Sequence, residues 1–124
     1  MGILAHCKAV NGILRATIGG VMEDADDARR SLIDIANAAK ERGVDRVLID
    51  PRQLEGESLP LADQHEIGAQ LVELGFEGMR IAWMPPPERI EQARFTTTVA
   101  RNRGIEVRLF ADRDAAERWL RGEP

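Results

Sequence analysis

The chain has few of the residues on which most catalytic and redox sites depend. Its 124 residues include one cysteine, Cys7, two histidines and no tyrosine. A single thiol cannot form an internal disulfide, and low cysteine content is typical of the reducing cytosol. No apolar run approaches the roughly 18 residues that a membrane-spanning helix needs, and the segment MGILAHCKAV does not have the pattern of a signal peptide. We therefore expect a cytoplasmic protein with no transmembrane segment.

The chain also lacks an excess of positive charge. It carries 21 acidic and 17 basic residues, a net charge of −4, and only 4% of its residues are aromatic. Proteins that bind nucleic acids usually present a basic face, because neutralising phosphates drives their affinity. We therefore expect no nucleic-acid partner. The length favours a single domain over residues 1–124.

Hydrophobic periodicity alternates between strand and helix along the chain. Short, largely apolar runs predict strands at residues 3–9, 13–18, 46–50, 80–84 and 105–110. Longer stretches with apolar residues at helical spacing predict helices at residues 24–42, 61–74, 88–103 and 112–120. The order β-β-α-β-α-β-α-β-α predicts an α/β fold with a mixed five-stranded sheet, because strand–helix–strand units pair in parallel through right-handed crossovers.

Several residues predict where these elements begin and end. Asn11-Gly12 accepts the positive φ angles of a tight turn and predicts an N-terminal hairpin. Gly19-Gly20 is expected to end the second strand, and Pro51 the third. Ser58 is expected to cap the second helix and Asp112 the fourth, because both side chains accept hydrogen bonds from free backbone N–H groups.

The position of a binding site follows from the predicted sheet. Ligands of open parallel sheets gather beyond the carboxyl ends of the strands. Here those ends are the loops at residues 50–60, 84–88 and 110–112. The first loop is the longest and the most polar, so it is the first place to look for a site.

Four polar residues of that first loop are binding candidates: Asp50, Arg52, Glu55 and Ser58. Asp50 and Arg52 lie just past a buried strand and allow two interpretations. They form either a recognition pair for a ligand or partner, or a local ion pair that holds the loop in place.

The residue types needed for catalysis are not grouped. His6 and Cys7 are neighbours in a predicted strand, so their side chains point to opposite faces. The sequence has no G-x-S-x-G elbow, no P-loop and no G-x-G-x-x-G motif. The acidic residues around His65 match no metal-binding loop: Glu55, Glu57, Asp63 and Glu66. We expect no catalytic residue, no metal and no cofactor; the remaining enzymatic alternative is a hydrolase built around His65.

The third predicted helix has apolar residues on two sides. Ile90, Ala93 and Ala100 fall on one arc of a helical wheel, whereas Phe95 and Val99 fall roughly opposite. Either the first turn bends after the prolines at 85–87, or Phe95 and Val99 form a second apolar patch. Such a patch would suit a partner protein, a second subunit or an apolar ligand.

Three segments together resemble the STAS or SpoIIAA-like superfamily over nearly the whole chain. They are the N-terminal hairpin, the string RVLIDPRQLEG and the string FTTTVARNRGIEVRLFADRDAAERWL. The resemblance implies a right-handed βα superhelix and a binding module rather than a catalyst. In the branch of anti-sigma-factor antagonists, a serine after the third strand is phosphorylated within a D-S-[ST]-G pattern. The matching loop here begins Asp50-Pro51-Arg52-Gln53, so that switch does not carry over, and the chain is more similar to stand-alone bacterial SpoIIAA-like proteins.

Two functions are consistent with this resemblance. The first is a regulatory module that binds another protein or a second copy of itself. The alternative is a carrier of a small apolar molecule or lipid, since some relatives of that branch resemble SEC14-type domains. The bulky, adaptable side chains near predicted strand and helix ends favour this alternative: Met22, Met79, Trp83 and Met84.

Overall fold

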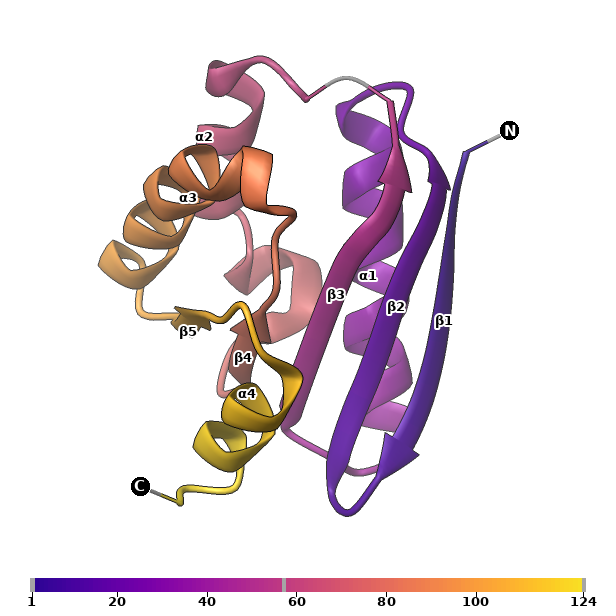
Figure 1. Cartoon of the computed structure of the whole chain (residues 1–124), viewed down its shortest axis with the longest axis vertical. Coiled ribbons are helices and arrows are strands. Elements are labelled where there is room, and N and C mark those ends of the chain that lie inside the picture. Colours follow the sequence, from indigo (N-terminus) through magenta and orange to yellow (C-terminus); the bar gives the residue numbers. More distant parts are fainter. Residues whose placement is uncertain (1, 57, 124) are drawn as a thin grey trace.

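A five-stranded sheet forms the centre of the molecule in the computed structural model, which describes residues 2–56 and 58–123 (Figure 1). The strands lie in the order in which they occur along the chain. They are β1 (Ile3–Val10), β2 (Ile13–Val21), β3 (Arg46–Glu55), β4 (Arg80–Trp83) and β5 (Glu106–Leu109). Only β1 is antiparallel to its neighbour, so the predicted α/β fold with a mixed five-stranded sheet is confirmed.

Helices cover both faces of this sheet. They are α1 (Ala25–Glu41), α2 (Leu61–Ala69), α3 (Ile90–Asn102) and α4 (Arg113–Leu120). The core on one face joins the sheet to α1, α3 and the segment after α2, whereas the core on the other face joins it to α4 (Figure 1). Alternate residues of β3 enter the two cores, with Val47 and Ile49 on the first face and Leu48 on the second. In the parts of the chain that the structure describes, no helix is long and apolar enough to cross a bilayer.

The N-terminal hairpin turns where the sequence predicts. Asn11 and Gly12 both have positive φ angles, 53° and 79°, as a tight hairpin turn requires. The predicted end of the second strand at Gly19-Gly20 is wrong, because β2 continues to Val21. At Gly20, φ is 85° and an added Cβ would lie 2.7 Å from the carbonyl oxygen of Gly2. Glycine therefore allows β1 and β2 to stay in close contact here rather than ending the strand.

Strand β3 is also longer than predicted, since it passes through Pro51 and ends at Glu55. Its pairing with β4 ends at Ile49, opposite Trp83, and beyond that point β3 pairs with β2 alone. The register with β2 shifts between Thr17 and Gly19. A proline has no N–H to donate, and it is tolerated where a strand has one neighbour and an irregular register.

The helix predicted at residues 61–74 is shorter in the structure. Helix α2 ends at Ala69, and the chain continues as a separate turn at Val72–Phe76 that contains Gly75 at a φ of 116°. The predicted cap at Ser58 is wrong, because α2 begins after Pro60 without a side-chain cap.

Two other details concern α3 and α4. A short 3-10 turn, Pro87–Arg89, comes before α3. The predicted cap of α4 is confirmed, since Asp112 accepts a hydrogen bond from the N–H of Ala115 at 3.2 Å.

Candidate functional site

An apolar cavity of about 190 Å³ lies between the sheet and the layer of α1, α2 and α3. Its floor is formed by side chains from four neighbouring strands: Ile18, Ile49, Ile81, Trp83 and Val107. Its walls come mainly from the three helices, through Ala28, Leu32, Ile67 and Ala93, and from Leu71 just after α2. The cavity therefore occupies part of the space that a helix layer normally fills with side chains.

The arrangement of β3 and β4 explains why space remains there. Beyond Ile49 and Trp83 the two strands no longer pair, because β3 continues along β2. The chain after β4 runs through the prolines at 85–87, which have no N–H groups to continue the sheet. Several wall residues have small side chains that fill little of the resulting space: Ala28, Ser31, Gly68 and Ala93.

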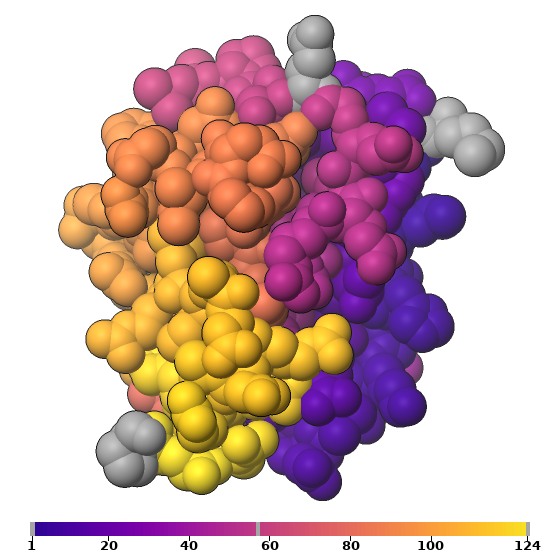
Figure 2. Space-filling model, in the orientation of Figure 1, coloured from indigo at the N-terminus to yellow at the C-terminus, as the bar shows by residue number. Residues whose placement is uncertain are grey.

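The loops after β3 and β4 form one side of the cavity. Ser58 and Leu59 line it from the first loop, and Pro85, Pro86 and Arg89 from the second. The Arg89 guanidinium donates a hydrogen bond to the carbonyl oxygen of Gly56 at 2.5 Å. Figure 2 shows the start of α3, in orange, beside the end of β3, in magenta, on the surface of the molecule. This contact holds the two loops together at the carboxyl ends of their strands.

Few polar atoms line the cavity. Gln64 and Gln92 approach each other through side-chain amides 3.5 Å apart, and the Gln64 amide donates to the carbonyl of Leu59 at 2.7 Å. The Thr96 hydroxyl donates to the carbonyl of Gln92 at 3.2 Å. Ser31 is 6% exposed, and its hydroxyl has no hydrogen-bond partner among the described residues. The site thus offers a large apolar surface with a few neutral polar groups, which is the usual composition of a small-molecule pocket.

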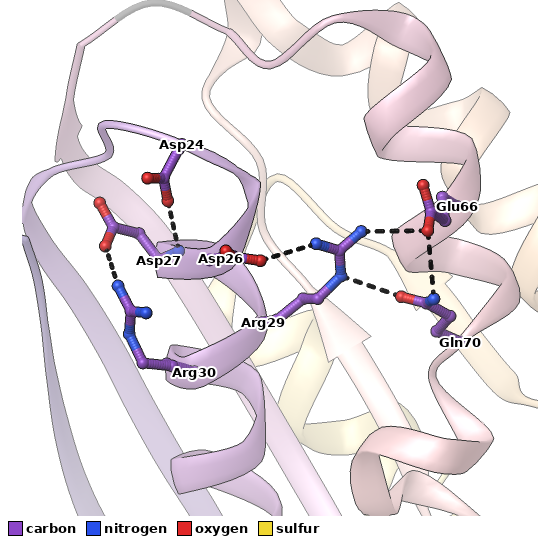
Figure 3. A network of polar contacts seen from close by, with 7 residues as sticks. All are labelled: Asp24, Asp26, Asp27, Arg29, Arg30, Glu66 and Gln70. Atoms are coloured by element: carbon purple, nitrogen blue, oxygen red, sulfur yellow. Dashed lines mark hydrogen bonds and ion pairs between the residues drawn. The ribbon is translucent and has the colours of Figure 1, made fainter.

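A polar network joins α1 to α2 beside the cavity (Figure 3). The Arg29 guanidinium donates to Gln70 at 3.0 Å and forms an ion pair with Glu66 at 3.4 Å. It also bonds Asp26 at 3.0 Å on its own helix. At the start of α1, the pKa of Asp27 is lowered, chiefly because its carboxylate accepts a hydrogen bond from the backbone N–H of Glu23. The contacts of Arg29 with Glu66 and Gln70 fix two walls of the cavity relative to each other.

The candidate pair Asp50 and Arg52 forms a local ion pair. Both oxygens of the Asp50 carboxylate accept hydrogen bonds from the Arg52 guanidinium, each at 2.8 Å. Asp50 is 8% exposed, and this burial acts to raise its pKa, but the hydrogen bonds from Arg52 outweigh it and the pKa lies below its ordinary value. Neither Asp50 nor Arg52 is among the described residues that line the cavity. The geometry matches the interpretation of a local ion pair, but the predicted loop position is wrong, because both residues lie within β3 and the pair therefore stabilises that strand.

The second apolar side of α3 is explained by α2, which sequence reasoning did not consider. Val99 is only 9% exposed, and a Cβ added at Gly68 of α2 would lie 3.5 Å from its Cβ. Phe95 is 40% exposed, and its ring lies 5.7 Å from that of His65 on α2. Val99 is therefore part of a helix–helix contact, and Phe95 lies at its outer margin.

The remaining candidates are not brought together. Glu55 is exposed at the end of β3, Ser58 is half-buried beside the cavity, and Glu57 lies outside the described residues. In residues 2–56 and 58–123, no three His, Cys, Asp or Glu side chains are placed to hold a metal ion. Cys7 and His6 point to opposite faces of β1 as predicted, and burial raises the pKa of the Cys7 thiol.

The cavity itself was only partly foreseeable from the sequence. Of the four bulky residues noted above, Met22 and Trp83 line the cavity. Met79 is buried in the core on the same face, and Met84 is buried on the opposite face. The loops after β3 and β4, where a site was predicted beyond the strand ends, form only one side of the cavity. The signal that was missed is the set of small residues on three different helices.

The comparisons with known proteins give no family for the chain. No protein-family model matches it, and no curated protein matches it either.

Proposed function

We propose that this protein binds a small apolar ligand in the cavity between the sheet and α1, α2 and α3. The observation that carries the proposal is the apolar lining of a space of about 190 Å³. An apolar cavity of roughly 150 Å³ in a protein can hold a benzene molecule. The volume here suits a single aromatic ring or a short aliphatic chain.

The arrangement of reactive groups also supports binding rather than catalysis. Near the cavity, the described residues include neutral amides and hydroxyls in contact with one another, but no nucleophile hydrogen-bonded to a base. His65, the one histidine close to this region in sequence, is exposed, and its ring contacts that of Phe95. The sequential strand order, with a helix after each of β2, β3, β4 and β5, supports the resemblance to SpoIIAA-like binding modules.

Calorimetric titration with toluene tests this proposal. Saturable binding at one site is expected for the natural sequence. Ala28→Leu should weaken binding at least about tenfold, because the larger side chain fills space that the ligand needs. Ala62→Leu is the matched control, since Ala62 is an exposed residue of α2 outside the cavity lining. Absence of binding to the natural sequence, or equal binding by the two variants, would contradict the proposal.

A second candidate function is association with another protein or a second copy through β1. This strand lies at an edge of the sheet, and Leu4 on it is 72% exposed. An edge strand presents unpaired backbone groups that can pair with another chain. Light scattering of the natural sequence and of Leu4→Lys tests it: a dimer that the variant converts to a monomer supports the candidate, and a monomer in both cases removes the support for self-association.

A further inference from the structure

We infer that the ligand is a small amphipathic anion whose carboxylate is bound by Arg89 while its apolar body occupies the cavity. This inference rests on the proposed function, and it specifies the chemical class of the ligand. It is carried by the charge of the cavity lining, by the single hydrogen bond that the Arg89 side chain makes among the described residues and by the two helices that begin beside the cavity.

Arg89 is the one charged residue among the described residues that line the cavity, and no carboxylate lines it in that part of the chain. The side chain is half-buried in the turn Pro87–Arg89. Its hydrogen bond goes to the carbonyl of Gly56, which is a neutral acceptor. A positive charge beside an apolar space interacts more strongly with an anion than it would in bulk water, because little solvent screens the pair. The lining therefore favours an anionic ligand over a cationic one.

Like Arg42 and Arg101, Arg89 donates to a backbone carbonyl, and of these three arginines it is the one that lines the cavity. Arg15, Arg29 and Arg52 each have a carboxylate within 3.0 Å. For Arg89, no acidic group of the described residues lies within ion-pair distance. A guanidinium has five N–H donors in a planar fork that fits a carboxylate. One of these donors bonds Gly56, and the others have no hydrogen-bond partner among the described residues that would compete with a ligand.

The backbone near Arg89 also favours an anionic ligand. Helices α2 and α3 both begin beside the cavity, where Gln64 and Gln92 of their first turns line it. Neither helix start is capped by a side-chain hydrogen bond. The dipole of a helix start favours negative charge. The two glutamine amides add neutral groups that can donate to a carboxylate oxygen.

Titration with phenylacetate and phenylacetamide tests the inference, because the two molecules have the same shape and differ in charge. The natural sequence should bind phenylacetate at least about tenfold more tightly, as expected for a hydrogen-bonded ion pair in a poorly solvated site. Arg89→Gln should remove this preference and leave the affinity for phenylacetamide nearly unchanged. Arg89→Lys should keep part of the preference, because it retains the charge without the fork.

Arg94→Gln is the matched control, since Arg94 is exposed on α3 and is paired with Glu91 instead of facing the cavity. It should bind both molecules as the natural sequence does. Circular dichroism of each variant checks that it is folded. Equal affinity for the two molecules, or a preference that persists in Arg89→Gln, would overturn the inference. If toluene binds and neither phenyl derivative does, the cavity stands and the anion site fails, whereas no binding of any of the three overturns both proposals.

Discussion

The two faces of the sheet are packed in different ways. On the face covered by α4, a single short helix buries large side chains almost completely, and Leu48, Met84 and Leu120 are each at most 1% exposed. On the face covered by α1, α2 and α3, three helices leave a cavity of about 190 Å³. More helical surface thus covers the face with the poorer packing. The number of covering elements does not decide how well a face is filled, because the size of the facing side chains and the fit between helices decide it.

The polar contacts of the two faces join different elements. On the α4 face, the Arg15 guanidinium and the Glu117 carboxylate form two hydrogen bonds, at 2.7 Å and 2.8 Å, which join β2 directly to α4. On the other face, the corresponding network runs between α1 and α2. We interpret the α4 face as the part that stabilises the fold and the cavity face as the part that binds.

The largest expected effect comes from truncating the α4 core. Leu120→Ala should lower the free energy of unfolding by about 2–5 kcal/mol, because it removes buried contacts and leaves a void that tight packing cannot close. Chemical denaturation measures the change. Leu4→Ala is the control, since Leu4 is 72% exposed, and it should change stability by less than about 0.5 kcal/mol. Similar losses in the two variants would contradict the described packing.

Enlarging one alanine on each face compares the two directly. Ala116→Leu, on α4, should lower stability by about 1–3 kcal/mol, because Ala116 is fully buried and the added atoms have no space. Ala28→Leu should cost less than about 1 kcal/mol, because Ala28 lines the cavity. Thermal and chemical denaturation of both variants measure these two losses of stability. A greater loss for Ala28→Leu would mean that the cavity is not free to be filled.

The ion pair of the α4 face predicts a pH dependence. The hydrogen bonds from Arg15 outweigh burial and lower the pKa of Glu117. A group with a lowered pKa stabilises the folded state above its pKa in the unfolded chain, about 4.3 for a glutamate, and this contribution is lost as the pH falls through the folded pKa. Glu117→Gln should therefore lower stability by about 1 kcal/mol at neutral pH and by progressively less in acid. A difference that does not change with pH would argue against the ion pair.

The smallest effect is expected at Ser31. Removing a buried hydroxyl that has no partner should leave the free energy of unfolding within about 0.5 kcal/mol of its original value or raise it slightly. Denaturation of Ser31→Ala measures this change. A loss well above 1 kcal/mol would show that the hydroxyl makes a stabilising contact in the folded protein.

The sequence predicts the framework of the fold because the framework depends on local signals. Asn11-Gly12 sets the hairpin, the apolar run at 46–50 marks a strand buried on both faces, and Asp112 caps α4. The errors occur where a distant contact overrides a local preference. Gly20 and Pro51 usually end strands, but here the first is needed for the approach of β1 and the second lies where β3 has one neighbour.

The candidate site is harder to predict from the sequence for a physical reason. A charged pair such as Asp50 and Arg52 attracts attention, yet the two groups satisfy each other. The cavity arises from what Ala28, Gly68 and Ala93 fail to fill, and these residues come from three helices whose relative positions are set by the whole fold. The surroundings of Phe95 and Val99 are equally hard to predict from the sequence, because they depend on the position of α2.

The two tryptophans provide the most direct test of the proposed binding site, because each reports on one face. Trp83 lines the cavity, whereas Trp119 packs against Phe110 on the α4 face. In Trp119→Phe, the fluorescence of Trp83 should change saturably as toluene is added. In Trp83→Phe, the fluorescence of Trp119 should stay constant over the same range. A silent Trp83, or equal changes at both tryptophans, would contradict binding in the cavity.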